Sequence, residues 1–141
     1  SFPALPERID VLIPIYNGFE FLAPLFDSLE CAHSTPFRLL VCNDASTDER
    51  VQSWLERRLQ DFPDAILLRN ENNLGFVGTV NRLFAQVMND FVLLNSDVQV
   101  PPFWLERLFA PMLARSYSTT QGFFVSDGTG KASRPPRSSD Y

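Results

Sequence analysis

The residues best suited to chemistry in this chain are three polar side chains that directly follow an apolar stretch, residues 91–94. They are Asn95, Ser96 and Asp97. Four apolar residues without alternation are typical of a strand covered on both faces, as in a parallel sheet, where ligands bind beyond the carboxyl ends of the strands. A carboxylate there is placed to hold a divalent cation, because Mg²⁺ usually sits between one or two carboxylates and substrate phosphates. The alternative is an Asx-type turn in which the tripeptide caps a following helix.

Polar side chains also mark the ends of two other apolar stretches, residues 10–16 and 37–42. Tyr16 offers a ring face for a base and a hydroxyl for a phosphate or sugar, although a tyrosine at a strand end is most often simply half-buried. Asp44 is placed to accept a hydrogen bond from the N3–H of uracil or thymine. For Asp48 we favour a structural interpretation, an acid that caps the next helix.

A glycine and an asparagine of interest lie in residues 70–82, between Asp44 and Asn95. Gly75 permits a positive φ or a close backbone approach at the entry to a helix, where exposed N–H groups would face a ligand phosphate. Asn81 falls off the apolar stripe of that helix, so we expect it to point toward the site. Each signal is weak alone, but their placement after successive strands is specific.

The apolar pattern alternates between strands and helices from Ile9 to Leu113. Strands are expected at residues 10–16, 37–42, 65–68 and 91–94, and apolar residues at helical spacing occupy residues 19–29, 47–59, 80–88 and 101–112. Pro24 is expected to kink or delay the first helix, and Pro101 and Pro102 to lie in the first turn of the last one. Such alternation implies right-handed βαβ crossovers, and therefore an α/β fold with an open, mostly parallel sheet and helices on both faces. The first and fourth strands should be neighbours, because a topological switch there creates the binding crevice.

Several classes of protein are disfavoured by composition and motifs. The net charge of −5 argues against a nucleic-acid partner, which needs a basic surface. No apolar run approaches the ~20 residues that span a bilayer, and the first residues lack a signal peptide. Cys31 and Cys42 fit no metal-binding spacing, so we expect reduced thiols and a cytoplasmic location, at most peripheral to the inner face of the membrane. No Gly-x-Gly-x-x-Gly follows the first strand, which argues against a dinucleotide Rossmann domain or a Walker-type phosphate loop.

The chain is expected to divide at residue 113. Residues 1–113 carry the strand and helix pattern and read as one α/β domain. Residues 114–141 are rich in Ser, Thr, Gly, Pro and Arg and carry a small basic surplus, so we expect an irregular or disordered segment with at most one weak strand, near residues 117–125.

Four motifs, at residues 11–17, 41–48, 72–76 and 93–98, together closely resemble family 2 of the inverting glycosyltransferases. The likeness is strongest to bacterial rhamnosyltransferase-like members and covers about residues 9–113, the nucleotide-sugar half of that fold. It implies a Rossmann-like nucleotide-diphospho-sugar transferase fold and a role in bacterial cell-surface polysaccharide biosynthesis.

The resemblance also assigns roles to residues. It implies that Asp44 binds the nucleotide base, that the Tyr16 region contacts the nucleoside, and that the Asp-X-Asp motif binds Mn²⁺ or Mg²⁺ and the diphosphate. Here the first acid of that motif is Asn95, so Asp97 would be the principal metal ligand and the diphosphate would supply much of the coordination. The nucleotide-binding candidates are Pro14, Tyr16, Asn17, Asp44, Gly75, Asn81 and Ser96.

The second half of the family's catalytic domain, which supplies the general base and the acceptor site, has no counterpart in this sequence, and Asp127 is a poor candidate for the base. The chain therefore reads as truncated. We favour the donor-binding half of an enzyme that transfers a sugar from a UDP- or dTDP-sugar to a hydroxyl of a glycan or lipid-linked sugar with inversion. The alternatives are a nucleotide-sugar-binding module without turnover and a nucleotidylyltransferase. The isolated chain should be inactive and should dimerise or aggregate, because apolar surface near residues 91–94 and 105–112 would be left exposed.

Overall fold

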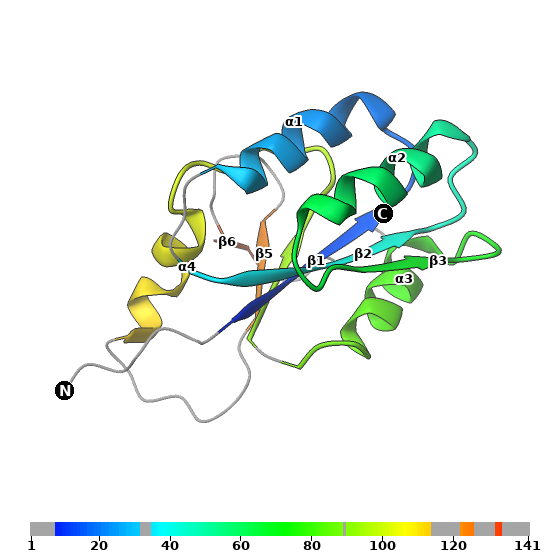
Figure 1. Cartoon of the computed structure of the whole chain (residues 1–141). Helices are drawn as coiled ribbons and strands as arrows, with labels where there is room; N and C mark the ends of the chain where they lie inside the picture. The colour runs from blue at the N-terminus through cyan, green and yellow to red at the C-terminus, as the bar shows by residue number, and fades with distance from the viewer. Residues whose placement is uncertain (1–7, 32–34, 89, 114–121, 126–131, 134–141) are drawn as a thin grey trace.

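The computed structural model describes residues 8–31, 35–88, 90–113, 122–125 and 132–133 (Figure 1). Within these residues six strands form one sheet, in the order β3-β2-β1-β4-β5-β6. They are β1 (Ile9–Ile15), β2 (Phe37–Asn43), β3 (Ile66–Arg69), β4 (Phe91–Leu94), β5 (Gly122–Val125) and β6 (Ala132–Ser133). The first five run parallel, and β6 is antiparallel to β5. The predicted α/β fold is confirmed, and β1 and β4 are neighbours as expected.

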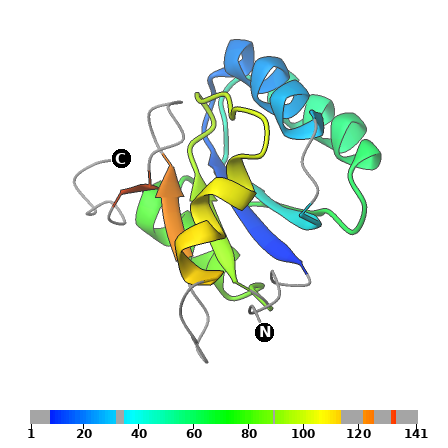
Figure 2. The same cartoon turned by 90° about the vertical axis from the view of Figure 1, so that its left-hand side faces the viewer.

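Helices cover both faces of this sheet. They are α1 (Phe19–Glu30), α2 (Arg50–Arg58), α3 (Gly75–Phe84) and α4 (Trp104–Leu113), with a short 3-10 helix, η1 (Leu59–Asp61), after α2. Buried side chains of α1, α2 and α4 share one core cluster with the sheet, whereas α3 packs on the other face. Figure 1 shows α1 and α2 on one side of the sheet and α3 on the other, and Figure 2 shows α4 in front of the sheet.

The core explains why the central strands lack alternation. All seven residues of β1 are buried, since helices press on both of its faces. Phe26 of α1 makes edge-to-face contacts with Trp54 and Phe62, at centroid distances of 5.2 and 5.8 Å. Each large apolar side chain buried in this way contributes roughly 1.5–3 kcal/mol. The sheet is therefore a rigid platform for the loops at its edges.

The prolines behave differently from expectation. Pro24 lies inside α1, which runs on without a break. Its exposed position explains this, because the carbonyl left without a partner at Glu20 faces water. Pro101 and Pro102 precede α4 rather than lie in its first turn, and Phe103, with φ of 59°, separates them from the helix.

The exposed apolar surface was predicted in the wrong place. Leu105 and Phe109 of α4 are fully buried, in the same core cluster as side chains of α1 and the valines of the preceding loop. The exposed side chains include Leu74, Val77 and Phe84 of the α3 region. Helix α3 ends at Phe84, so the apolar pattern that we extended to residue 88 does not continue on its buried face.

Residues 114–141, for which an irregular or disordered segment was expected, contribute β5 and β6 to the sheet. Their other residues lie outside those described. None of the helices that the structure describes has the length and apolar character to cross a bilayer.

A buried ion pair lies at the amino edge of the sheet. Asp10 of β1 is fully buried and faces Arg38 of β2, whose Nε and one terminal N–H donate to its carboxylate at 3.0 and 3.1 Å. The Met88 N–H also donates to Asp10, at 2.8 Å, and Arg38 donates to the Gln86 carbonyl. The pair ties the connection between α3 and β4 to the edge opposite the predicted site.

Candidate functional site

The predicted site residues follow strands that end at the same edge of the sheet. Ile15 of β1 pairs with Asn43 of β2, and Asn43 pairs with Arg69 of β3, so the loops after these strands begin side by side. β4 lies on the other side of β1 and runs in the same direction. Tyr16, Asp44 and Asp97 therefore all lie at or near the carboxyl edge, where ligands of open α/β sheets bind.

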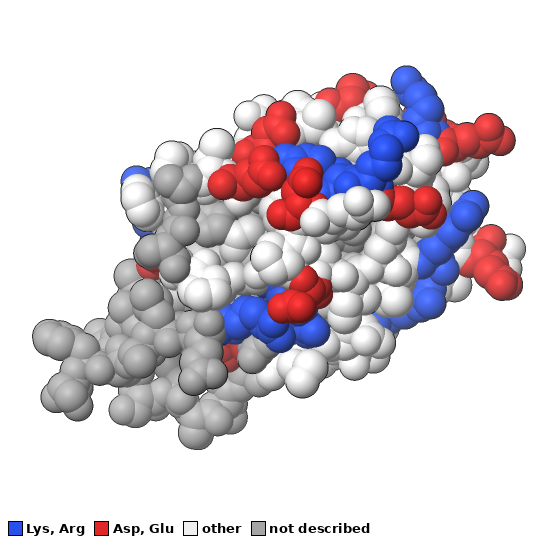
Figure 3. Space-filling view, in the orientation of Figure 1, with Lys and Arg blue, Asp and Glu red and all other residues white. Residues whose placement is uncertain are grey.

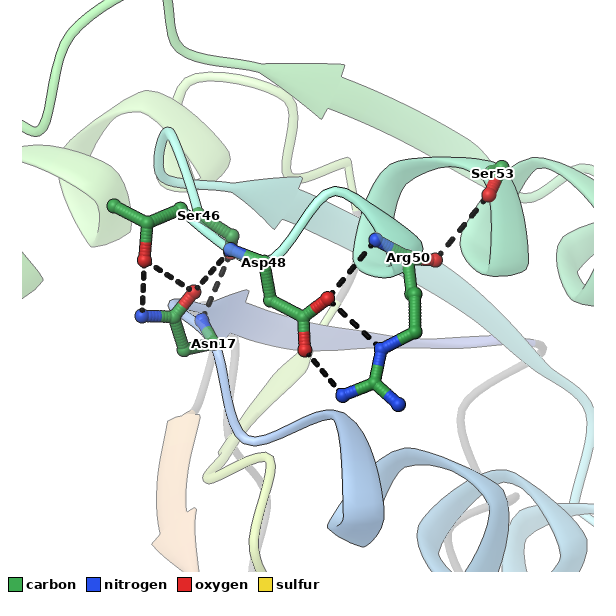
Figure 4. Close-up of polar contacts among 6 residues, drawn as sticks. Asn17, Ser46, Asp48, Arg50 and Ser53 are labelled. Atoms are coloured by element: carbon green, nitrogen blue, oxygen red, sulfur yellow. Dashed lines mark hydrogen bonds and ion pairs between the residues drawn. The ribbon is translucent and has the colours of Figure 1, made fainter.

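Asn17 joins the loop after β1 to the loop after β2 (Figure 4). Its backbone N–H donates to Ser46 Oγ at 2.8 Å, and its side-chain amide donates to Thr47 Oγ1 at 3.0 Å. Its Oδ1 accepts the N–H of Asp48 at 3.0 Å. Asn17 adopts a left-handed conformation, φ 54°, which asparagine tolerates better than most residues. The Asn17 side chain thus holds the loops after β1 and β2 together.

Asp48 lies two residues before α2 and binds its first backbone N–H group, in line with the structural interpretation. Its Oδ1 accepts the backbone N–H of Arg50, the first residue of α2, at 3.0 Å. The Arg50 guanidinium forms a two-point ion pair with the same carboxylate, with a shortest distance of 2.7 Å. The hydrogen bonds from the Arg50 side chain and backbone hold the pKa of Asp48 below its usual value.

Asp44 is fully buried at the end of β2, and its carboxylate is used inside the protein. Oδ1 accepts the Leu74 N–H at 2.7 Å and the Asn70 side-chain amide at 2.9 Å, and Oδ2 accepts the Gly75 N–H at 3.0 Å. Asp44 therefore binds the first turn of α3, where a carboxylate suits the helix dipole. The two N–H groups that we expected to face a phosphate are bonded to Asp44 instead.

Asn70 and Arg82 complete this arrangement, although no sequence motif pointed to either residue. Asn70 is buried and donates to Asp44 and to Thr79 Oγ1, at 2.9 and 3.1 Å. Arg82 of α3 donates to Asn70 Oδ1 at 2.6 Å, and the Cys42 thiol donates to the same oxygen at 3.4 Å. Burial raises the pKa of Cys42 to about 11, so its thiol stays protonated at neutral pH. The usable signal was a polar residue directly after β3.

Several other candidates are accessible or lie in the sheet. Tyr16 is 42% exposed at the end of β1, and Asn81 is exposed on α3. Pro14 is a buried member of β1, opposite Cys42. Gly75 has φ of 80°, a left-handed conformation that glycine adopts without strain.

The tripeptide after β4 forms a turn and caps no helix, since α4 begins only at Trp104. The alternative of a helix cap is therefore wrong. Asn95 and Ser96 are half-buried and Asp97 is exposed, and the structure gives their side chains no hydrogen bond or ion pair within the described residues. These oxygens suit a hard cation. In the described part of the chain no three His, Cys, Asp or Glu residues form a cation cluster, so a ligand phosphate would have to supply further oxygens.

A polar hollow of about 920 Å³ opens beside α2 and the carboxyl ends of β2 and β3. Its lining includes Asn43, Ser46, Gln52, Arg69, Asn70 and Glu71. In the residues described here, the Arg69 guanidinium has no ion-pair partner, so it is a free cation at this edge. Figure 3 shows acidic and basic side chains interspersed on the face that carries α1 and α2.

Parallel strands whose polar loops meet at one carboxyl edge define a class of α/β nucleotide-binding domains. Residues 10–140 match the family model of Glycosyl transferase family 2, and the chain belongs to this family. The match confirms the family identified from the four motifs and argues against a nucleotidylyltransferase. No curated protein matches the chain.

Solved glycosyltransferases share the fold. The chain superposes on S. aureus TarS 1–349 in complex with UDP-GlcNAc with a TM-score of 0.63 and 21% identity, covering 76% of this chain and 31% of that one. It superposes on the mannosyltransferase PcManGT from Pyrobaculum calidifontis, in complex with GDP-Man and Mn²⁺, with a TM-score of 0.66 and 21% identity, covering 78% and 33%. The chain thus spans about a third of these structures and has the α/β fold of nucleotide-sugar transferases.

Proposed function

We propose that the chain is the donor-binding part of an inverting glycosyltransferase that takes its sugar from a UDP- or dTDP-sugar. The observation that carries the proposal is the convergence of Tyr16, Arg69 and the Asp97 turn at one edge of a family 2 domain. An exposed ring, a free guanidinium and an uncommitted carboxylate are what a base, a phosphate and a cation require. The motif likeness supports a rhamnosyltransferase-like enzyme of bacterial cell-surface polysaccharide synthesis.

The residues at this edge would have separate tasks. Tyr16 would stack on the nucleobase, and Asp97 with Asn95 would hold Mn²⁺ or Mg²⁺ against the diphosphate. When bound, the metal would offset the charge of the leaving diphosphate. Ser96 and Asn81 would donate hydrogen bonds to the donor. Asp44 and Asn17 would act indirectly, since their side chains hold the loops and not the ligand in the described geometry.

Transfer also requires a base to remove the proton of the acceptor hydroxyl as that oxygen attacks the anomeric carbon. The four motifs assign no residue to this base, and the chain spans only about a third of its structural neighbours. We therefore propose that residues 1–113 carry mainly the donor half. The acceptor, a glycan or a lipid-linked sugar at the cytoplasmic face of the membrane, would bind elsewhere in the enzyme. The 141-residue chain by itself would bind donor without transferring sugar.

A binding panel tests this proposal. The 141-residue chain would be titrated calorimetrically with UDP, dTDP, GDP and their sugars, with and without Mn²⁺. We expect binding of at least one nucleotide that Mn²⁺ strengthens, and loss of most of the Mn²⁺ effect in Asp97→Asn. Asp64→Asn is a matched control, because Asp64 is an exposed acid at the opposite edge whose one ion pair among the described residues is with Arg8 at the surface. Equal Mn²⁺ dependence in both variants would remove Asp97 from the metal site.

The alternative is a nucleotide-sugar-binding module without turnover. It is favoured by the single carboxylate at the metal position, where the family motif has two. A longer form of the protein that contains the acceptor half separates the two functions. Release of nucleotide diphosphate that depends on an added acceptor supports the transferase, whereas donor binding without release supports the module.

A further inference from the structure

We propose that Arg82 is a positioning residue, which sets the orientation of the Asn70 amide and thereby holds Asp44 and the entrance of α3 in place at the donor site. The anchoring itself stands on the geometry alone. Its consequence for nucleotide binding rests on the proposed function.

Arg82 lies on α3, yet its guanidinium contacts the end of β3. One terminal nitrogen donates to Asn70 Oδ1 at 2.6 Å and to the Arg69 carbonyl at 2.9 Å. The guanidinium of Arg82 is always charged, and charged donors form the stronger hydrogen bonds. Arg82 therefore selects which end of the Asn70 amide faces it.

The orientation of the Asn70 amide has a large effect on its buried surroundings. Both side-chain N–H groups of Asn70 are used, one on Asp44 and one on Thr79, while its oxygen faces Arg82 and Cys42. A rotated amide would place its oxygen against the Asp44 carboxylate and its N–H groups against the guanidinium. Both contacts would be repulsive, and buried polar groups without partners are costly. Arg82 thus removes the competing orientation.

The fixed Asn70 amide in turn supports the contacts that join the loops after β2 and β3 at the carboxyl edge of the sheet. Asp44 accepts the N–H groups of Leu74 and Gly75, and its carbonyl accepts the Asn73 side chain at 3.3 Å. These bonds bind the segment after β3 to the loop after β2. That segment, with Arg69 and Asn70, lies beside the polar hollow. Without Arg82, the segment would lose its fixed position while the sheet stayed intact.

The test compares Arg82→Met, which removes the donor and keeps the length, with Arg82→Lys, which restores a charged donor. Arg57→Met is the matched control, because Arg57 is exposed on α2 and has no side-chain partner in the described structure. Amide hydrogen exchange measured by NMR reports the anchoring directly. We expect about tenfold faster exchange at Leu74 and Gly75 in Arg82→Met, the scale of one lost charged hydrogen bond. Arg82→Lys should recover most of this change.

The amides of Leu12 and Leu40, in the central strands, report global stability, and we expect them to be unchanged. The affinity for the nucleotide that binds most tightly in the panel should fall by roughly three- to tenfold in Arg82→Met. A change of this size is the scale of one lost hydrogen bond to a charged group. Unchanged exchange at Leu74 and Gly75 would overturn the proposal. So would an unfolded variant, or equal acceleration at all four amides, because Arg82 would then act on stability alone. If exchange responds locally but the wild-type chain binds no nucleotide, the anchoring is upheld and the proposed function fails.

Discussion

Replacement of Asp44 by asparagine separates two roles for this residue, reading of the base and attachment of α3. Asparagine keeps the size of the side chain but carries no charge, and it has one acceptor oxygen where aspartate has two. One oxygen could still accept the Leu74 N–H, but the new amide would then meet the Gly75 N–H, a donor against a donor. The structure therefore predicts a loss of stability, because Asp44 is fully buried, where solvent does not reach to replace the lost partner.

The magnitude follows from two contributions. A lost hydrogen bond to a charged group costs about 1.5–3 kcal/mol, and the lost interaction with the helix N-terminus about 0.3–1 kcal/mol. We expect the free energy of unfolding to fall by about 2–4 kcal/mol, which lowers Tm by roughly 6–16 °C in a domain of this size. Calorimetry and urea unfolding would measure both. Asp64→Asn is again the control, because its exposed ion pair contributes only about 0–1 kcal/mol.

The same variant also tests the role implied by the family resemblance. If Asp44 reads the base, Asp44→Asn should lose nucleotide affinity while its stability stays close to that of the wild-type chain. Stability within about 0.5 kcal/mol of the wild type, the scatter of an ordinary surface substitution, would refute our account of Asp44 as the anchor of α3.

Three further predictions concern stability and association. Arg38→Met should cost about 3–5 kcal/mol in unfolding free energy, because it leaves the buried Asp10 carboxylate without the compensating charge of Arg38, and an Asp10→Leu, Arg38→Met double variant should recover most of that loss in urea melts. Because the pKa of Cys42 is raised to about 11 from 9.0, the unfolded chain releases the thiol proton first, so stability should decline between pH 9 and 11, by on the order of 2 kcal/mol. Cys42→Ala should flatten this decline, and an equally steep decline would contradict the assignment. The expected self-association should depend on the exposed apolar residues of α3, so a Val77→Asp, Phe84→Asp variant should shift light-scattering mass toward the monomer. An unchanged mass distribution would place the contact elsewhere.

Much of the fold could be predicted because its signals are local. An apolar run such as residues 91–94 needs burial on both faces whatever surrounds it, and helical spacing needs one covered face. These demands place β1, β2 and β4 and the helices between them, and the βαβ rule then makes the strands parallel. The errors are also local in origin. Pro24 was given too much weight because a proline on an exposed face of a helix is tolerated, and the helical pattern of residues 80–88 was expected to continue past Phe84, where α3 ends.

The sequence by itself determined the family, the first four strands with the first and fourth as neighbours, and the edge at which Tyr16, Asp44 and Asp97 lie, because each of these follows from short motifs and the ends of apolar runs. Only the tertiary structure decided what those side chains do there. Asp44 finds its partners 30 and 31 positions further along the chain, at Leu74 and Gly75. Whether a carboxylate at a strand end faces a ligand or a helix depends on where α3 docks, and docking is set by packing across the whole sheet, which no local pattern encodes.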